Sequence, residues 1–245
     1  MGQVLAVVSG KGGTGKTSVC AAVACAMAQM GQKVLCIDAD VGLRNLDISL
    51  GMSQEPALPF TAVMSGEYPL EKASVHPKFQ NLHFLTAPVT KQPEDLDEES
   101  FFSMLRDAAE VYDWIFVDAP AGVGAGFHLA AKKADIAMVV TGGDPAALRD
   151  GARTAAALEA ISNAEAKIVV NRICRRFFQK LRFTVDDCMD TVGLPLLGIV
   201  PEDEAVYLSA AAGKPLTRSG KKGAQEACKH IAMRLLGKKA ALLDI

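Results

Sequence analysis

Residues 10–17 place glycines, two lysines and a threonine at a spacing that binds phosphate. The stretch Gly-Lys-Gly-Gly-Thr-Gly-Lys-Thr fits the pattern G-x-x-x-x-G-K-[ST]. Glycines let backbone N–H groups surround the phosphates, Lys16 adds a positive charge, and Thr17 offers a hydroxyl to Mg²⁺. We therefore expect a nucleoside triphosphate to bind here with Mg²⁺. The predicted contacts are Gly10, Lys11, Gly12, Gly13, Thr14, Gly15, Lys16, Thr17 and Ser18.

Three aspartates follow apolar runs of the kind that form buried strands. Asp118 ends the run 114–118, while Asp38 and Asp40 end the run 34–40. Strand carboxyl ends face the ligand crevice in an open α/β sheet, so these acids should point toward the phosphates. Asp118 is predicted to lie near the metal, through a water. The alternative for Asp118 and Asp40 is that each caps a following helix.

The elements that position these residues are predicted to alternate between strand and helix. Short Val/Ile/Leu-rich runs indicate strands buried on both faces, in a mostly parallel sheet flanked by helices on both sides. The expected fold class is a three-layer α/β P-loop fold, with one domain over residues 1–237 and a short tail over 238–245. The expected strands are 4–8, 34–38, 82–86, 114–118, 136–141, 167–171 and 196–200, and the expected helices 17–30, 95–112, 145–161 and 226–236.

The composition of the chain limits its cellular location and the kinds of site it can hold. The 245 residues are half apolar, the start of the chain has no signal-peptide pattern, and no apolar run is long enough to span a membrane, so we expect a cytosolic protein. Six cysteines without a C-x-x-C pair favour neither zinc nor disulfides, and the four histidines receive no role. From residue 165 onward, 14 basic residues stand against 9 acidic ones, which fits either a polyanionic partner or a solvated basic surface.

Lys11 is a second lysine inside the phosphate loop, directly after its first glycine. The run 11–17 resembles the deviant phosphate loop of the MinD/ParA class of ATPases, in which this extra lysine reaches the partner's nucleotide across a dimer. The resemblance implies an ATP-dependent homodimer in which Lys11 makes catalysis conditional on dimerisation. The alternative is a solvated loop charge.

Further stretches extend this resemblance to most of the chain. Residues 38–47 resemble the first switch of the MinD family, which implies that Asp40 orients the attacking water, that Asp38 assists near the metal, and that Asn45 lies toward the dimer interface. An ordinary carboxyl pKa near 4 makes orientation a more suitable task for Asp40 than strong base catalysis. Residues 148–153 are similar to a helix at the family's dimer and partner surface, so Asp150 is expected there. The alternative is that Arg149 and Asp150 are solvated helix charges.

Two segments resemble those that enclose adenine in the family, residues 168–172 and 198–203. Asn171 is the predicted base reader, since a side-chain amide can read adenine's edge; alternatively it bonds the adjoining backbone. The other expected base-side contacts are Arg172, Pro201, Glu202 and Asp203.

Two segments depart from the family. Only residues 238–245 follow Gly237, where family members usually carry an amphipathic membrane-binding helix, so this tail is either a short lipid contact or a frayed or packed terminus. Residues 172–182 hold five basic and two adjacent aromatic residues. This basic segment could bind DNA phosphates, face lipid, lie near the nucleotide, or form a solvated helix whose apolar residues Phe177, Phe178 and Leu181 enter the core.

Together these features favour a Mg²⁺-dependent, dimer-activated ATPase switch that hydrolyses ATP and positions the division septum, with an activating partner protein analogous to MinE. It would be cytoplasmic, with peripheral attachment to the inner face of the cell membrane as an option. A ParA-like partition ATPase that binds nonspecific DNA through Arg175, Arg176 and Lys180 is the alternative. A housekeeping enzyme or metallocluster carrier that shares the loop is a third hypothesis.

Overall fold

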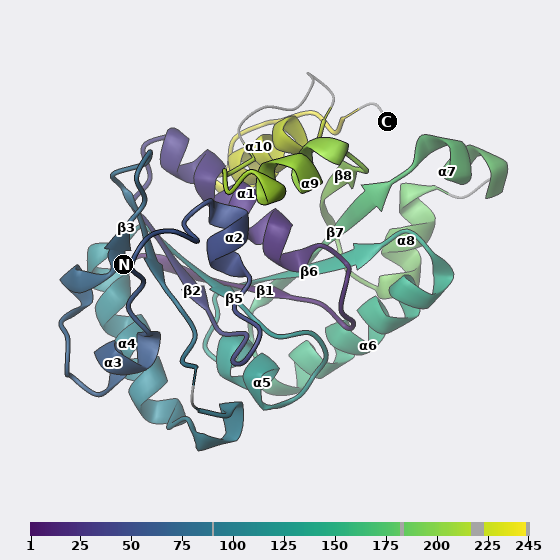
Figure 1. Cartoon of the computed structure of the whole chain (residues 1–245). Helices are drawn as coiled ribbons and strands as arrows, with labels where there is room; N and C mark the ends of the chain where they lie inside the picture. The colour runs from purple at the N-terminus through teal and green to yellow at the C-terminus, as the bar shows by residue number, and fades with distance from the viewer. Residues whose placement is uncertain (90, 182–183, 217–222, 244–245) are drawn as a thin grey trace.

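The computed structural model describes residues 1–89, 91–181, 184–216 and 223–243. Its centre is an eight-stranded sheet in the order β3-β4-β2-β5-β1-β6-β7-β8, in which neighbouring strands are parallel except for the antiparallel pair β3 and β4 (Figure 1). The strands are β1 (Gln3–Val8), β2 (Val34–Asp38), β3 (Ser74–Val75), β4 (Leu82–Leu85), β5 (Trp114–Asp118), β6 (Ile136–Gly142), β7 (Glu165–Ile173) and β8 (Leu196–Pro201).

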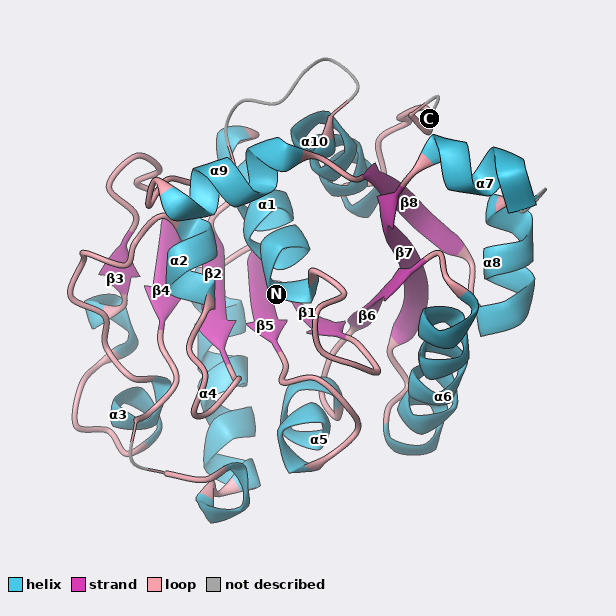
Figure 2. Cartoon of the chain, turned by 45° about the vertical axis from the view of Figure 1, so that its right-hand side comes forward, coloured by secondary structure: helices cyan, strands magenta, loops and turns pink. Residues whose placement is uncertain are grey.

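Helices cover both faces of this sheet, which confirms the predicted fold class (Figures 1 and 2). Their bounds are α1 (Lys16–Gln29), α2 (Leu46–Leu50), α3 (Phe60–Met64), α4 (Glu98–Val111), α5 (Ala125–Ala131), α6 (Pro145–Ile161), α7 (Arg175–Leu181), α8 (Val185–Val192), α9 (Glu204–Ala211) and α10 (Ala224–Leu235). Two short 3₁₀ turns, η1 (Leu70–Lys72) and η2 (Pro93–Asp95), complete the described elements.

The sheet separates two large apolar cores, because successive side chains of a strand point to opposite faces. Along β1, Leu5 and Val7 pack with α1 and α10, whereas Val4, Ala6 and Val8 pack with α4 and α5. A smaller third core joins α6 and α8 to β7 and β8. Burial on both faces explains why these strands are near-continuous apolar runs.

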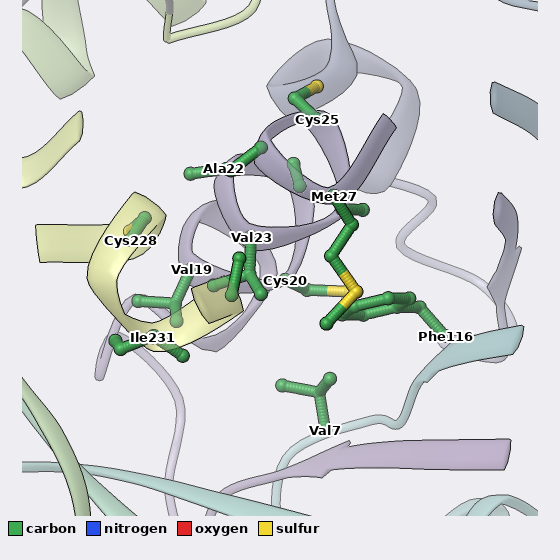
Figure 3. Packing of buried hydrophobic residues seen from close by; sticks show 14 of the residues in the cluster. Val7, Val19, Cys20, Ala22, Val23, Cys25, Met27, Phe116, Cys228 and Ile231 are labelled. Carbon is green, nitrogen blue, oxygen red and sulfur yellow. The ribbon is translucent and has the colours of Figure 1, made fainter. Parts of the chain in front are cut away.

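Helix α1, which follows the phosphate loop, is buried on nearly all sides. Its side chains are mostly small, so the sheet and α10 approach it closely; Met27 and Cys20 lie toward Phe116, and Val19 lies beside Ile231 of α10 (Figure 3). Packing is equally close under α10, because a Cβ on Gly198 of β8 would lie 2.5 Å from Ile231 Cγ1. The position of α1, and with it the loop, is therefore set by dense packing.

The predicted long elements are confirmed to within a few residues, and β2, β5 and α6 have the predicted bounds. Sequence reasoning missed the two-residue strand β3 and the short helices, which carry too little periodicity to be recognised. The described part of the tail, residues 238–243, forms neither helix nor strand. Arg234 donates to the Ala240 carbonyl at 3.1 Å, and Leu243 packs against the core. The last two residues of the predicted tail, 244 and 245, lie outside the described residues. Among described residues, no helix is long and apolar enough to cross a membrane.

Candidate functional site

The phosphate loop connects β1 to α1 and depends on glycine at several positions. Gly13 and Gly15 have φ angles of 79° and 83°, in the left-handed region that other residues rarely adopt. At Gly10, a Cβ would lie 2.5 Å from the Asp150 carbonyl oxygen. A side chain at Gly15 would collide with the Asn171 amide. Side chains at these positions would therefore prevent the backbone conformation and the close contacts of the loop. A loop built of glycines is the kind of backbone that can wrap around a phosphate.

Lys16, Thr17 and Asp118 form a buried polar cluster at the start of α1. Lys16 Nζ lies 2.7 Å from Asp118 Oδ1, and the Thr17 hydroxyl donates to Asp118 Oδ2 at 2.7 Å. The parallel pairing of β1 and β5 places Val7 opposite Asp118, which brings the strand end beneath the loop. Burial raises the pKa of Asp118, while the Lys16 ammonium opposes that rise.

Asp38 faces this cluster from β2, where it pairs in register with Asp118. Its carboxylate accepts backbone hydrogen bonds from Asp40 at 3.0 Å and from Leu46 at 3.1 Å, so it fastens both ends of the segment 40–46. Burial and the negative charge of Asp118 raise the pKa of Asp38 to about 7. Burial also raises the pKa of Asp40, although Lys16 opposes the shift. The three predicted acids therefore gather around one end of the loop.

The residues predicted at a dimer interface come from the loop, from α6 and from the N-terminus of α2. The Lys11 ammonium lies 3.7 Å from an Asp144 oxygen, and both side chains are well exposed. Asp150 lies behind the loop, where its carbonyl faces Gly10 and its carboxylate lies 3.7 Å from Arg153. Asn45 is exposed at the N-terminus of α2.

A cavity of about 270 Å³ opens next to the loop, between the ends of β7 and β8. Asn171 borders it and donates through Nδ2 to the Thr14 carbonyl at 2.7 Å. Arg172 has a φ of 58° and points its guanidinium toward Gly13 O at 3.4 Å and Glu202 at 3.1 Å. The residues that line this cavity are Gly13, Gly15, Ser18, Val19, Ala22, Asn171, Arg172, Val200, Pro201, Glu202, Asp203, Val206, Tyr207, Leu216, Ala224 and Cys228.

The structure thus brings all five predicted base-side residues to one cavity. Sequence reasoning missed its apolar walls. They come from α1, α9, α10 and the segment after α9, and they comprise Val19, Ala22, Val206, Tyr207, Leu216, Ala224 and Cys228. These residues bear no motif. Except for Leu216, their only sequence signal was their place on helices that start near the loop or after Pro201.

A second cavity of about 610 Å³ lies against the outer side of the loop. It is bordered by Lys11, Asp144, Cys174 and Phe178. It shares Gly13, Asn171, Arg172 and Glu202 with the first cavity. Sequence reasoning did not anticipate this cavity. It lies on the side of the loop where Lys11 is exposed.

The basic segment forms the end of β7 and the short helix α7, which projects from the sheet (Figures 1 and 2). Arg175, Arg176 and Lys180 are exposed on it. Phe178 is partly buried and packs beside Gly143 and Ile173, as the solvated-helix interpretation expects. The parts of the prediction that concern the side chains of Phe177 and Leu181, and residue Arg182, lie outside what the structure describes.

Comparison with known proteins agrees with this geometry. The profile of the CobQ/CobB/MinD/ParA nucleotide binding domain matches residues 5–216. The septum site-determining protein MinD of Synechocystis sp. is 36% identical over all of this chain and 93% of its own length. The fold is similar to that of the MinC:MinD cell division protein complex of Aquifex aeolicus, with a TM-score of 0.89, 33% identity and 98% of both chains covered.

A further similar structure is MinD complexed with Mg-ADP from Pyrococcus horikoshii, with a TM-score of 0.81, 27% identity and 96% of both chains covered. The phosphate loop, the acids at the ends of β2 and β5, and these full-length similarities agree with one another. The chain belongs to the MinD family of nucleotide-binding ATPases.

Proposed function

We propose that this protein is an ATP-dependent dimerising switch that hydrolyses ATP to ADP and phosphate and acts in positioning the division septum. The observation that carries the proposal is the cluster of Lys16, Thr17, Asp118 and Asp38 beneath a phosphate loop that also carries Lys11. Its relatives are septum site-determining proteins over their full length, which supports the same task for this chain.

We assign adenine to the first cavity. Asn171 Nδ2 donates one of its two N–H groups to the Thr14 carbonyl, which fixes the amide at the cavity wall. The acceptor oxygen of the amide suits the exocyclic amino group of adenine. The apolar walls from α9 and α10 suit a planar base. We assign the phosphates to residues 10–18, and Pro201 and Glu202 to the rim around the base.

The donor set beneath the loop fits a magnesium ion. It consists of one hydroxyl and two carboxylates, all oxygen donors, which are the ligands that Mg²⁺ prefers. Thr17 would hold the ion directly, Asp118 through a water, and Asp38 would lie close by. When bound with ATP, Mg²⁺ neutralises charge on the β- and γ-phosphates. Lys16, which neutralises Asp118 here, then turns its ammonium to the phosphates.

Hydrolysis needs a positioned water and donors on the transferred oxygens, with little covalent chemistry from the protein. Asp40 is only partly buried at the start of the segment 40–46, so it can orient that water. Lys11 of each subunit leaves Asp144 and reaches the nucleotide of the other. Turnover therefore depends on dimer formation, with Asn45 and Asp150 on the same interface.

The dimer acts at a surface. One of the similar structures is a MinC:MinD complex, which supports partner proteins for this chain, including an activator analogous to MinE. We propose a cytoplasmic protein whose ATP-bound dimer attaches peripherally to the inner membrane face. DNA is the second candidate surface, because Arg175, Arg176 and Lys180 are exposed together on the projecting α7.

Light scattering with Mg²⁺ and a non-hydrolysable ATP analogue tests the switch. The proposal expects twice the nucleotide-free mass, and a monomer at saturating analogue contradicts it. Two further experiments distinguish the membrane from DNA as the surface that the dimer binds. They are sedimentation with anionic liposomes, with and without ATP, and salt-dependent retention of random duplex DNA. Removal of residues 238–245 should abolish liposome binding if the tail is the lipid contact. Substitution of Arg175 and Arg176 by Ala should instead weaken DNA retention if α7 is the DNA contact.

A further inference from the structure

Asp203 uses one carboxylate for two helix N-termini. Oδ1 accepts from Ala205 N at 2.9 Å in the first turn of α9, and Oδ2 accepts from Ala224 N at 2.9 Å in the first turn of α10. Asp203 is itself the N-cap of α9, whereas the N-cap position of α10 is Gly223, which offers no side chain. The first turn of α10 is thus capped by a residue 21 positions before Ala224.

Helices α9 and α10 differ strongly in how much of their surface is buried. Helix α10 buries Ala224, Ala227, Cys228, Ile231 and Ala232, and Ile231 touches the sheet at Gly198. Helix α9 is apolar along most of its length, yet none of its residues is buried. A helix with so little burial draws little stability from packing and depends more on its cap. The Asp203 carboxylate therefore ties a loosely packed helix to a firmly packed one.

Both helices line the cavity assigned to the base. Helix α9 supplies Val206 and Tyr207, and helix α10 supplies Ala224 and Cys228. Tyr207 is 59% exposed at this wall, so α9 forms the side of the cavity that faces solvent. A shift of α9 away from α10 would widen the cavity and separate the wall from the base.

We propose that Asp203 is a positioning residue for nucleotide binding. By capping α9 and α10 together it holds Tyr207 and Val206 against the base, and so sets ATP affinity without touching the phosphates. This inference rests on the proposed function, in which ATP places its base in this cavity. It also changes the role expected for Asp203, since both carboxylate oxygens already accept backbone hydrogen bonds.

The test compares Asp203→Ala, which removes both caps, with Asp203→Asn, which keeps one acceptor oxygen. The matched control is Asp97→Ala, which removes the N-cap of α4, where Asp97 accepts from Ser100 N at 2.8 Å on an exposed surface. Calorimetric titration measures the affinity of each full-length variant for Mg-ATP and for inorganic tripolyphosphate, which carries phosphates but no base. Circular dichroism verifies folding, and steady-state kinetics give KM and kcat.

We expect Asp203→Ala to weaken ATP binding by about 2- to 30-fold, which corresponds to the roughly 0.5–2 kcal/mol that loss of a helix cap costs. Asp203→Asn should weaken it less, KM should rise with kcat nearly unchanged, and tripolyphosphate affinity should remain within about twofold. Asp97→Ala should lose thermal stability but keep its ATP affinity. If Asp203→Ala does not fold, the Asp203→Asn comparison decides.

Two results would overturn the inference: ATP affinity equal to that of the unchanged protein in the Asp203 variants, or an equal loss of ATP and tripolyphosphate affinity. Failure of the unchanged protein to bind ATP is a separate outcome, and it would remove the proposed function instead.

Discussion

The Lys16 ammonium lies 2.7 Å from the Asp118 carboxylate, in a pair that is almost completely buried. The side chains are 6% and 1% exposed, so each charge depends on the other for compensation. Since we propose Lys16 as a phosphate contact, we expect nucleotide binding to exchange this carboxylate for phosphate. We expect the Thr17 hydroxyl, which also donates to Asp118, to take part in the same exchange.

Removing one partner of this pair should destabilise the protein in a pH-dependent way. We expect Lys16→Ala to lower the free energy of unfolding by about 3–5 kcal/mol at pH 7.5, because Asp118 is left buried without a counter-charge. The loss should shrink at acidic pH, because burial raises the pKa of Asp118 and removal of Lys16 takes away the charge that opposes this rise. Urea denaturation at pH 7.5 and at acidic pH measures this, and an equal loss at both would contradict it.

Asp38 should make stability depend on pH between about 4 and 7. Its pKa is raised from 3.8 to about 7, so the folded state binds the proton more tightly than the unfolded chain. The free energy of unfolding should therefore fall by up to about 4 kcal/mol as pH rises through this range. Asp38→Asn should reduce the slope of this dependence. Asp107→Asn, on the exposed side of α4, should leave the slope unchanged.

Lys11 should be needed for dimerisation and not for nucleotide binding. We expect Lys11→Ala to bind Mg-ATP within about threefold of the unchanged protein, because its loss removes only an exposed pair worth at most about 1 kcal/mol within the subunit. Dimer formation and turnover should be lost. Light scattering and phosphate release measure the two effects, and undiminished turnover would exclude a cross-dimer role.

Asp40 should be needed for hydrolysis and not for assembly. We expect Asp40→Ala to form a stable ATP-bound dimer and to release phosphate at least about tenfold more slowly, since the water loses its orienting group. The variant is measured by light scattering with hydrolysable ATP, followed by analysis of the bound nucleotide. Normal turnover would assign the water to another residue.

The sequence predicted the fold where local pattern and burial agree. Strands β2 and β5 are bounded by turns and buried on both faces, and α6 begins with Pro145 directly after its capping residue Asp144. These features can be recognised within a few residues of the chain, and the same holds for the phosphate loop. The acids at Asp38 and Asp118 could be placed because parallel strands end at one edge of the sheet.

Features that depend on distant contacts could not be predicted. His76 received no role, yet it is fully buried and its Nε2 bonds the Leu50 carbonyl, 26 residues earlier. Asp203 was expected at the base, and it borders that cavity, but one of its two backbone hydrogen bonds comes from Ala224, in a helix that starts 21 residues later. The spacing of residues along the chain does not show which distant backbone groups a side chain will contact after folding. The sequence therefore identifies the polar residue but not its hydrogen-bond partner.

The packing of helix α1 limits which parts of the molecule can change conformation when the bound nucleotide changes. Because small side chains lock it between the sheet and α10, rolling or sliding of this helix would leave empty space in a closely packed core. We therefore expect the response to the γ-phosphate in the segment 40–46, which begins at Asp40 and includes the exposed Gly42 and Leu43. The part of the nucleotide site that α1 forms therefore stays fixed, whereas the segment 40–46 can change conformation.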